Sequence, residues 1–182
     1  MTNALLVIDV QDSFRSPERW DTLSDPDIAD RAAVLVDHAR RRGDDVVWVL
    51  HAEPGSGGPF DPASGQVRLM AGLEPRDGEP VLTKTSHNAF TTTALAQHLT
   101  SRGVGEVTVI GIRTEQCCET TARVAGDLGY AVRFVIDATA TNPLPRWDGA
   151  GTLSTDEVKA RTAAALHGRF AEVVTMQQVL AS

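Results

Sequence analysis

The 182-residue chain has few of the features that mark a secreted, membrane-bound or nucleic-acid-binding protein. Its only two cysteines, Cys117 and Cys118, are adjacent and therefore cannot form a long-range disulfide. The net charge is −7 and no basic block is present, which argues against nucleic acid or an anionic membrane as a partner. No apolar run reaches the length of a membrane span, and the start of the chain lacks a basic, apolar leader. We therefore expect a cytoplasmic protein in a reducing compartment.

Ligands for metals and nucleotides are also scarce. His51 and Glu53 follow an apolar run, but the next stretch has no companion histidine, so we expect no metal. The glycines of residues 55–58 do not follow a strand and open a helix in phosphate-binding spacing, so we expect no nucleotide cofactor. No repeat, low-complexity tract or linker divides the chain, which predicts one domain over residues 1–182.

Short apolar runs alternate with amphipathic segments along the whole chain, which is typical of an α/β protein. Strands are expected at Ala4–Ile8, Val46–Leu50, Pro80–Thr83, Val107–Ile110, Ala131–Ile136 and Ala171–Val174. Helices are expected at Asp27–Arg42, Thr91–Arg102, Thr114–Gly129, Thr155–Gly168 and Met176–Leu180. This order predicts a three-layer α/β/α fold with a six-stranded, mostly parallel sheet covered on both faces.

Three connections show no clear period, and we expect loops there. They are Arg15–Asp25, Pro54–Glu79 and Thr139–Leu153. The second is rich in Gly and Pro and long for a connection, which is typical of a loop over a site. The third is expected to close over the same site, with Trp147 among its residues.

The stretch EVTVIGIRTEQCCETTA, residues 106–122, places Cys117 where a strand turns into a helix. The dipole and free amides of a helix N-terminus stabilise a thiolate, and the thiolate is the nucleophilic form of cysteine. The same amides can hold an oxyanion. Free cysteines are also among the most buried residues and commonly have no chemical role, so this stretch alone leaves both interpretations open.

Two further charged residues follow predicted strands. Asp9 ends the first strand, and ligands bind at the carboxyl ends of strands in open parallel sheets. Capping of the next turn is an equally good explanation for an acid there. Lys84 follows the third predicted strand; a lysine in a loop is ordinarily solvated, but this one would stand at the same edge as Asp9 and Cys117.

Three motifs together resemble the isochorismatase-like cysteine hydrolases, which include nicotinamidases, N-carbamoylsarcosine amidases and streptothricin hydrolases. They are IDVQDSF around Asp9, VLTKTSHNAF around Lys84 and GIRTEQCCETTARVAGDLGYAV around Cys117, and the third is the most specific. The resemblance runs from about Ala4 to Leu180. It implies an isochorismatase-like hydrolase fold with a Rossmann-like sheet, a catalytic set of Asp9, Lys84 and Cys117, and a homodimer or higher homo-oligomer.

The resemblance also implies a cis peptide bond between Ile112 and Arg113, which would aim the amides of Arg113 and Cys117 at an oxyanion. The chain departs from the family in three places. Arg113 stands where a small residue is common, and Cys118 stands where valine is common; we expect the Cys118 side chain in the core. The metal-binding nicotinamidases carry an Asp-x-His pattern, but residues 49–51 read Val-Leu-His, which counts against both metal and nicotinamide.

From these features we predict a cysteine hydrolase that cleaves a C–N bond of a small amide, ureide or lactam-like molecule through a thioester. The alternatives are an isochorismatase-type vinyl-ether hydrolase, which does not need the thiol, and a non-catalytic binding protein on the same fold. Loop position and resemblance indicate six pocket residues: Gln11, Phe14, Trp20, Phe90, Arg113 and Trp147. Whether the Arg113 side chain contacts substrate, and whether a neighbouring subunit completes the pocket, is left open by the sequence.

Overall fold

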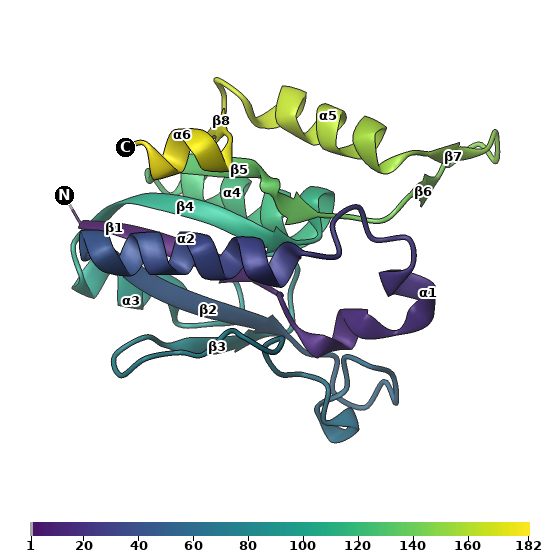
Figure 1. The fold of residues 1–182 in the computed structure, drawn as a ribbon, viewed down its shortest axis with the longest axis horizontal. Helices are drawn as coiled ribbons and strands as arrows, with labels where there is room; N and C mark the ends of the chain where they lie inside the picture. Colours follow the sequence, from purple (N-terminus) through teal and green to yellow (C-terminus); the bar gives the residue numbers. More distant parts are fainter. Residues whose placement is uncertain (1) are drawn as a thin grey trace.

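Six strands form one parallel sheet in the computed structural model, which describes residues 2–182 (Figure 1). Their order across the sheet is β3-β2-β1-β4-β5-β8. The strands are β1 (Thr2–Ile8), β2 (Asp45–His51), β3 (Val81–Lys84), β4 (Val104–Ile112), β5 (Ala131–Ala140) and β8 (Glu172–Val174). All five pairings are parallel, which confirms the predicted six-stranded sheet.

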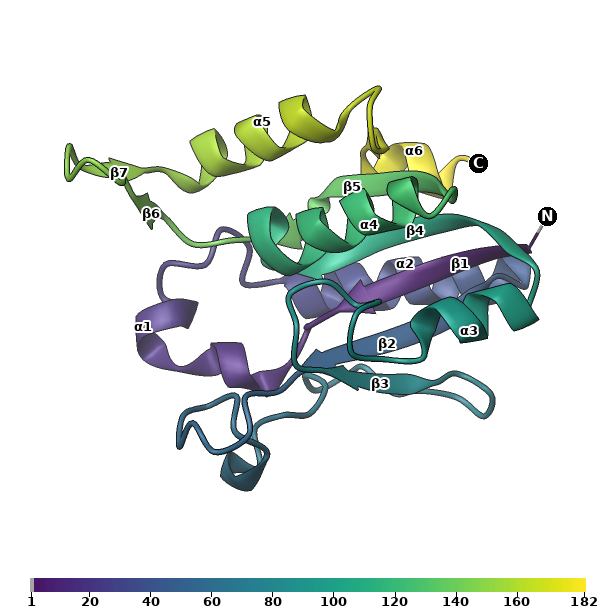
Figure 2. The ribbon, with the colours of Figure 1, turned by 180° about the vertical axis from the view of Figure 1, so that it is seen from behind.

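Helices cover both faces of this sheet, which gives the predicted three layers. On one face lie α2 (Ile28–Arg42) and α6 (Met176–Leu180). The opposite face, turned toward the viewer in Figure 2, carries α3 (Leu95–Ser101) and α4 (Glu119–Asp127), and α5 (Thr155–Leu166) packs beside α4. The helix α2 ends at Gly43, whose φ of 76° gives the left-handed turn that favours glycine.

The core is divided between the two faces because side chains alternate along each strand. In β1, Leu5 and Val7 point into the layer under α2, whereas Leu6 and Ile8 point into the layer under α3 and α4. All four side chains are buried, so β1 is apolar on both faces, as a central parallel strand requires.

The connection Arg15–Asp25, expected to be a loop, contains a short helix, α1 (Pro17–Trp20). Pro17 stands at its first turn, where its fixed φ suits a helix and its missing N–H costs nothing. One turn was too short to show a helical period in the sequence. The long connection between β2 and β3 contains one 3₁₀ turn, Pro62–Ser64.

The connection Thr139–Leu153 is more regular than expected. The strand β5 continues to Ala140, and β6 (Leu144–Pro145) then pairs with β7 (Thr152–Leu153) as an antiparallel hairpin. Figure 1 shows this hairpin extending away from the sheet. Trp147 lies in the turn that joins β6 and β7, and its side chain is 98% exposed. The expectation that Trp147 closes over the site is therefore wrong. Two paired residues per strand give too short a pattern to be read from sequence.

Candidate active site

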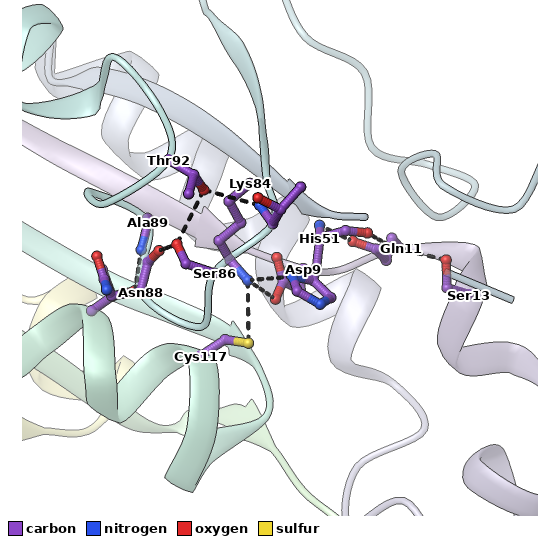
Figure 3. Close-up of polar contacts among 12 residues, drawn as sticks. Asp9, Gln11, Ser13, His51, Lys84, Ser86, Asn88, Ala89, Thr92 and Cys117 are labelled. Atoms are coloured by element: carbon purple, nitrogen blue, oxygen red, sulfur yellow. Dashed lines mark hydrogen bonds and ion pairs between the residues drawn. The ribbon is translucent and has the colours of Figure 1, made fainter. Parts of the chain in front are cut away.

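Lys84 is the centre of a buried polar cluster at the carboxyl ends of the strands (Figure 3). Its Nζ donates to Asp9 Oδ2 at 2.8 Å and to Cys117 Sγ at 3.2 Å, and it lies 3.3 Å from His51 Nδ1. Asp9 and Lys84 are fully buried and Cys117 is 6% exposed. The structure therefore brings together the three residues that the sequence indicated.

The register of the sheet produces this meeting. Lys84, the last residue of β3, pairs with His51 at the end of β2. Ile8, the last residue of β1, pairs with Gly111 near the end of β4. A side chain at Gly111 is impossible because its Cβ would lie 1.9 Å from the Ile8 carbonyl oxygen, and its φ is 130°. This glycine lets the two central strands approach closely where they deliver Asp9 and Cys117.

Asp9 has a left-handed backbone, with a φ of 53°. Such a conformation is uncommon for a residue with a side chain and is concentrated at functional sites. The amide of Asp9 donates to the Val49 carbonyl at 2.8 Å, so β2 holds the turn in place. The turn points the carboxylate at Lys84 and not along the strand, which favours a functional role over simple capping.

Cys117 lies in a π-helical turn, Thr114–Cys118, that leads into α4. The turn begins at Arg113, whose carbonyl accepts the amides of Gln116 and Cys118 at 3.2 and 3.1 Å. The peptide bond between Ile112 and Arg113 is cis. Cys118 is completely buried in the core on the α4 side of the sheet, as predicted, whereas Cys117 keeps 6% of its surface exposed and contacts Lys84.

Burial controls the protonation of the cluster. Burial raises the pKa of the Asp9 carboxyl above its ordinary value, although the Lys84 ammonium opposes the shift. Burial is the largest single influence on the pKa of Lys84 and lowers it, but the charges and hydrogen bonds of Asp9 and Cys117 together more than offset burial, and the net shift is upward. Burial raises the pKa of the Cys117 thiol to about 12; the Asp9 carboxylate adds to the rise and Lys84 opposes it.

The resting thiol of Cys117 is therefore neutral at pH 7. The helix N-terminus was expected to favour the thiolate, but desolvation and the adjacent carboxylate outweigh that effect. A nucleophile can form here only if a base receives the thiol proton during attack. Asp9 lies beside the thiol and has one oxygen, Oδ1, that is buried without a hydrogen-bond partner among the described residues.

His51 is neutral beside this cluster, because burial and the Lys84 charge lower its pKa. An ammonium only donates, so Nδ1 accepts from Lys84, and Nε2 faces Glu53 Oε1 at 3.4 Å. Gln11 fixes the backbone of His51 from below: its Oε1 accepts the His51 amide at 2.7 Å and its Nε2 donates to the His51 carbonyl at 2.9 Å. Gln11 thus positions the end of β2.

A cavity of about 150 Å³ reaches Asp9 and Cys117. Two of the six expected pocket residues, Phe14 and Arg113, line it. Its other lining residues are Arg19, His51, Glu53, Phe60, His87 and Gln116. In the sequence, His51 and Glu53 were considered as metal ligands, with scaffold or pocket wall as the more ordinary role for His51, and Gln116 adjoins the nucleophile. Phe60 lies in the connection that was expected to cover a site and His87 in the motif around Lys84, but nothing in the sequence singled out either residue, and no signal marked Arg19.

Comparison with known proteins identifies the family. A family model described as the isochorismatase domain matches residues 3–178. The chain belongs to the isochorismatase family. This isochorismatase-family hydrolase is 34% identical to an uncharacterized family member of Bacillus subtilis over 99% of both chains. It is also 34% identical to a streptothricin hydrolase of Streptomyces noursei, over 94% of this chain and 67% of that protein.

A solved structure has the same fold. The hydrolase of the isochorismatase family from Chromobacterium violaceum superposes with a TM-score of 0.91 at 31% identity, covering 99% of this chain and 92% of the other. The predicted isochorismatase-like fold is therefore confirmed for this isochorismatase-family hydrolase.

The remaining four expected pocket residues do not line the cavity of this isochorismatase-family hydrolase. Gln11 is buried under His51. Trp20 packs against the core with the Arg15 guanidinium 4.7 Å above its ring. Phe90 is buried and stacks on Tyr130, with ring centroids 6.1 Å apart. Trp147 is exposed on the β6–β7 hairpin. Large aromatic rings filled core positions that loop location alone could not reveal.

Two absences hold for residues 2–182. No group of three His, Cys, Asp or Glu side chains lies close enough to hold a metal ion. No helix is long and apolar enough to cross a membrane.

Proposed function

We propose that this chain is a cysteine hydrolase that cleaves a carbon–nitrogen bond of a small amide, ureide or lactam-like molecule through a thioester. The observation that carries the proposal is the buried contact of Lys84 Nζ with both Asp9 Oδ2 and Cys117 Sγ, at 2.8 and 3.2 Å, beside a cavity. A nucleophile, a base and a cation within hydrogen-bond reach are the parts that acyl transfer needs.

In the first step Asp9 takes the thiol proton as Sγ attacks the substrate carbonyl. Charge moves from the carboxylate to the sulfur and then to the carbonyl oxygen, while the Lys84 ammonium stays next to both Asp9 and Cys117. A thiol with a pKa of about 12 is protonated in the resting enzyme, so proton transfer to Asp9 accompanies the attack.

The amides of Arg113 and Cys117 then stabilise the oxyanion. Asp9 passes its proton to the leaving nitrogen, the C–N bond breaks, and a thioester remains on Cys117. A water molecule gives a proton to Asp9 and attacks the thioester. The proton returns to sulfur as the carboxylic acid leaves, which restores the starting state.

Two relatives support cleavage at a C–N bond. They are a nicotinamidase of Arabidopsis thaliana and a ureidoacrylate amidohydrolase of Caulobacter segnis, 36% and 28% identical to this chain. The cavity of about 150 Å³ supports a small-molecule substrate. The homo-oligomer, the cytoplasmic location and the single domain over residues 1–182 stay predictions.

The test is turnover of a panel of small amides and ureides, measured as the release of ammonia. Cys117→Ala is expected to lower kcat by about a thousandfold or more, because it removes the nucleophile. The matched control is Cys118→Ala, which deletes a neighbouring buried sulfur and costs roughly 1 kcal/mol of stability with turnover retained. Mass spectrometry of quenched wild-type enzyme should detect the acyl group on Cys117.

Turnover of a vinyl ether, with none of any amide or ureide, that survives Cys117→Ala but not Asp9→Asn would replace this proposal with vinyl-ether hydrolysis. No turnover of any amide, ureide or vinyl ether, with no acyl adduct, would favour a binding protein.

A further inference from the structure

Two arginines in the cavity have no carboxylate partner. Three half-buried arginines, Arg31, Arg40 and Arg123, form salt bridges, such as Arg40 with Glu79 at 2.8 Å. Arg19 and Arg113 are half-buried, line the cavity at Cys117, and form no salt bridge within residues 2–182. Each guanidinium carries a permanent charge and five N–H donors, so both residues bring positive charge without a carboxylate partner to the cavity.

The acids of the cavity do not neutralise them. The Asp9 carboxylate is bound to Lys84 at 2.8 Å. Glu53 is half-exposed, and its Oε1 lies 3.4 Å from His51 Nε2. His51 is neutral, so the cations at the site are Lys84 and the two arginines, and the carboxylates are those of Asp9 and Glu53. Because Lys84 is paired with Asp9, the excess positive charge lies on the arginines.

Arg19 is also held in place. Its Nη1 donates to Ser16 Oγ at 3.3 Å, and its guanidinium lies 5.4 Å from the centre of the Phe60 ring. Its carbonyl accepts from Asn142 Nδ2 at 2.6 Å, which fixes the short helix α1 against the connection after β5. An arginine stacked on an aromatic ring with donors left over is pre-organised to bind an anion.

We infer that Arg113 and Arg19 bind a carboxylate of the substrate, so that the substrate class is an amide or ureide that carries a carboxylate at its other end. The inference rests on the proposed function for the scissile group, but its anion site stands on the arginines alone. A guanidinium fits a carboxylate with two parallel N–H···O bonds, which gives direction as well as affinity. Arg113 begins the turn that carries Cys117, so one residue's side chain would bind the substrate while its amide meets the oxyanion.

The experiment compares matched pairs of substrates that differ only in the carboxylate. Succinamate is paired with butyramide, and 3-ureidopropionate with propylurea, each assayed by ammonia release. We expect kcat/KM to favour the carboxylate member by about tenfold or more, from the strength of hydrogen bonds between charged groups. Arg113→Met and Arg19→Met, which keep an apolar stem, should each remove most of this preference through KM.

Arg113→Lys should restore part of the preference, because the charge returns without the fork of donors. The control is Arg41→Met, which changes an exposed arginine on α2 that has no salt bridge among the described residues and should leave the preference unchanged. Equal turnover of both members of each pair, or a preference that both Met variants retain, would overturn the inference and leave the proposed function standing.

A binding measurement separates the two ideas when no pair is hydrolysed. Succinate and glutarate are titrated calorimetrically into Cys117→Ala and into the same variant with Arg113→Met. Binding that depends on Arg113 would support the anion site even though the C–N proposal had failed. Absence of carboxylate binding to Cys117→Ala would overturn the anion site.

Discussion

Replacing Lys84 by Met should destabilise the protein strongly, because it leaves the buried Asp9 carboxylate without its partner. Both side chains are 0% exposed, and Nζ lies 2.8 Å from Oδ2. At that distance and an effective dielectric constant of about 20, their attraction is about 6 kcal/mol, and desolvation of the two ions offsets much of it. Removal of one member of such a pair costs about 3–5 kcal/mol, since the other charge remains buried.

The loss should depend on pH. Without Lys84, burial loses its strongest opposing influence and the pKa of Asp9 in the folded state rises further above its unfolded value. A group with a raised folded pKa stabilises the fold below the unfolded pKa, and that stability is lost as pH rises through the folded pKa. The deficit of Lys84→Met relative to wild type should therefore be small near pH 4 and largest above pH 7. The double variant Asp9→Asn/Lys84→Met removes both charges and should recover part of the loss.

Urea unfolding at several pH values tests this prediction. Wild type, Asp9→Asn, Lys84→Met and the double variant are compared at each pH. For a chain of this length, the expected loss corresponds to a fall in Tm of roughly 6–20 °C at neutral pH. A Lys84→Met protein within 1 kcal/mol of wild type at pH 8, or a double variant no more stable than the single one, would refute the argument from burial.

Three further results follow from the same geometry. Asp9→Asn should abolish turnover yet lower the Cys117 pKa from about 12, since the carboxylate that raises it is gone; thiolate absorbance measures this, and a rise would contradict it. In wild type, kcat/KM should fall toward acid with a midpoint above 3.8, because only the carboxylate accepts the thiol proton and burial raises its pKa; a midpoint at or below 3.8 would count against Asp9 as the base. Gly111→Ala should cost at least about 3 kcal/mol in thermal unfolding, from its 1.9 Å clash added to a positive φ. Its control, Gly129→Ala, has a similar backbone but open space around it and should lose only about 1 kcal/mol; equal losses would exclude the clash.

The sheet and the polar cluster were accessible from sequence because each depends on a local pattern repeated along the chain. Parallel strands place their carboxyl ends at one edge, so apolar runs that end in Asp9 and Lys84 already place these residues at the same edge of the sheet, although capping by Asp9 and solvation of Lys84 remained open. The position of Cys117 followed from one strand-to-helix boundary. The family resemblance then linked the three motifs.

The cavity wall was much harder to predict. Arg19 and Phe60 belong to connections whose shape depends on tertiary contacts. Phe90, which was expected in the pocket, packs in the hydrophobic core instead. The state of the thiol was also missed. A helix N-terminus is visible in a sequence, but the degree of burial that raises the Cys117 pKa is a property of the folded chain.

The strand order has a consequence for how this protein reaches its working form. The central strand β1 pairs with β4, so that Ala4 lies beside Val107, about 100 residues later. Such a pairing closes a large loop, and the entropy cost of closure comes before the stabilising contacts form, so parallel sheets fold slowly. Asp9 and Cys117 follow the two strands that this pairing joins. Recovery of activity during refolding should therefore lag behind helix formation and report directly on when the middle of the sheet has assembled.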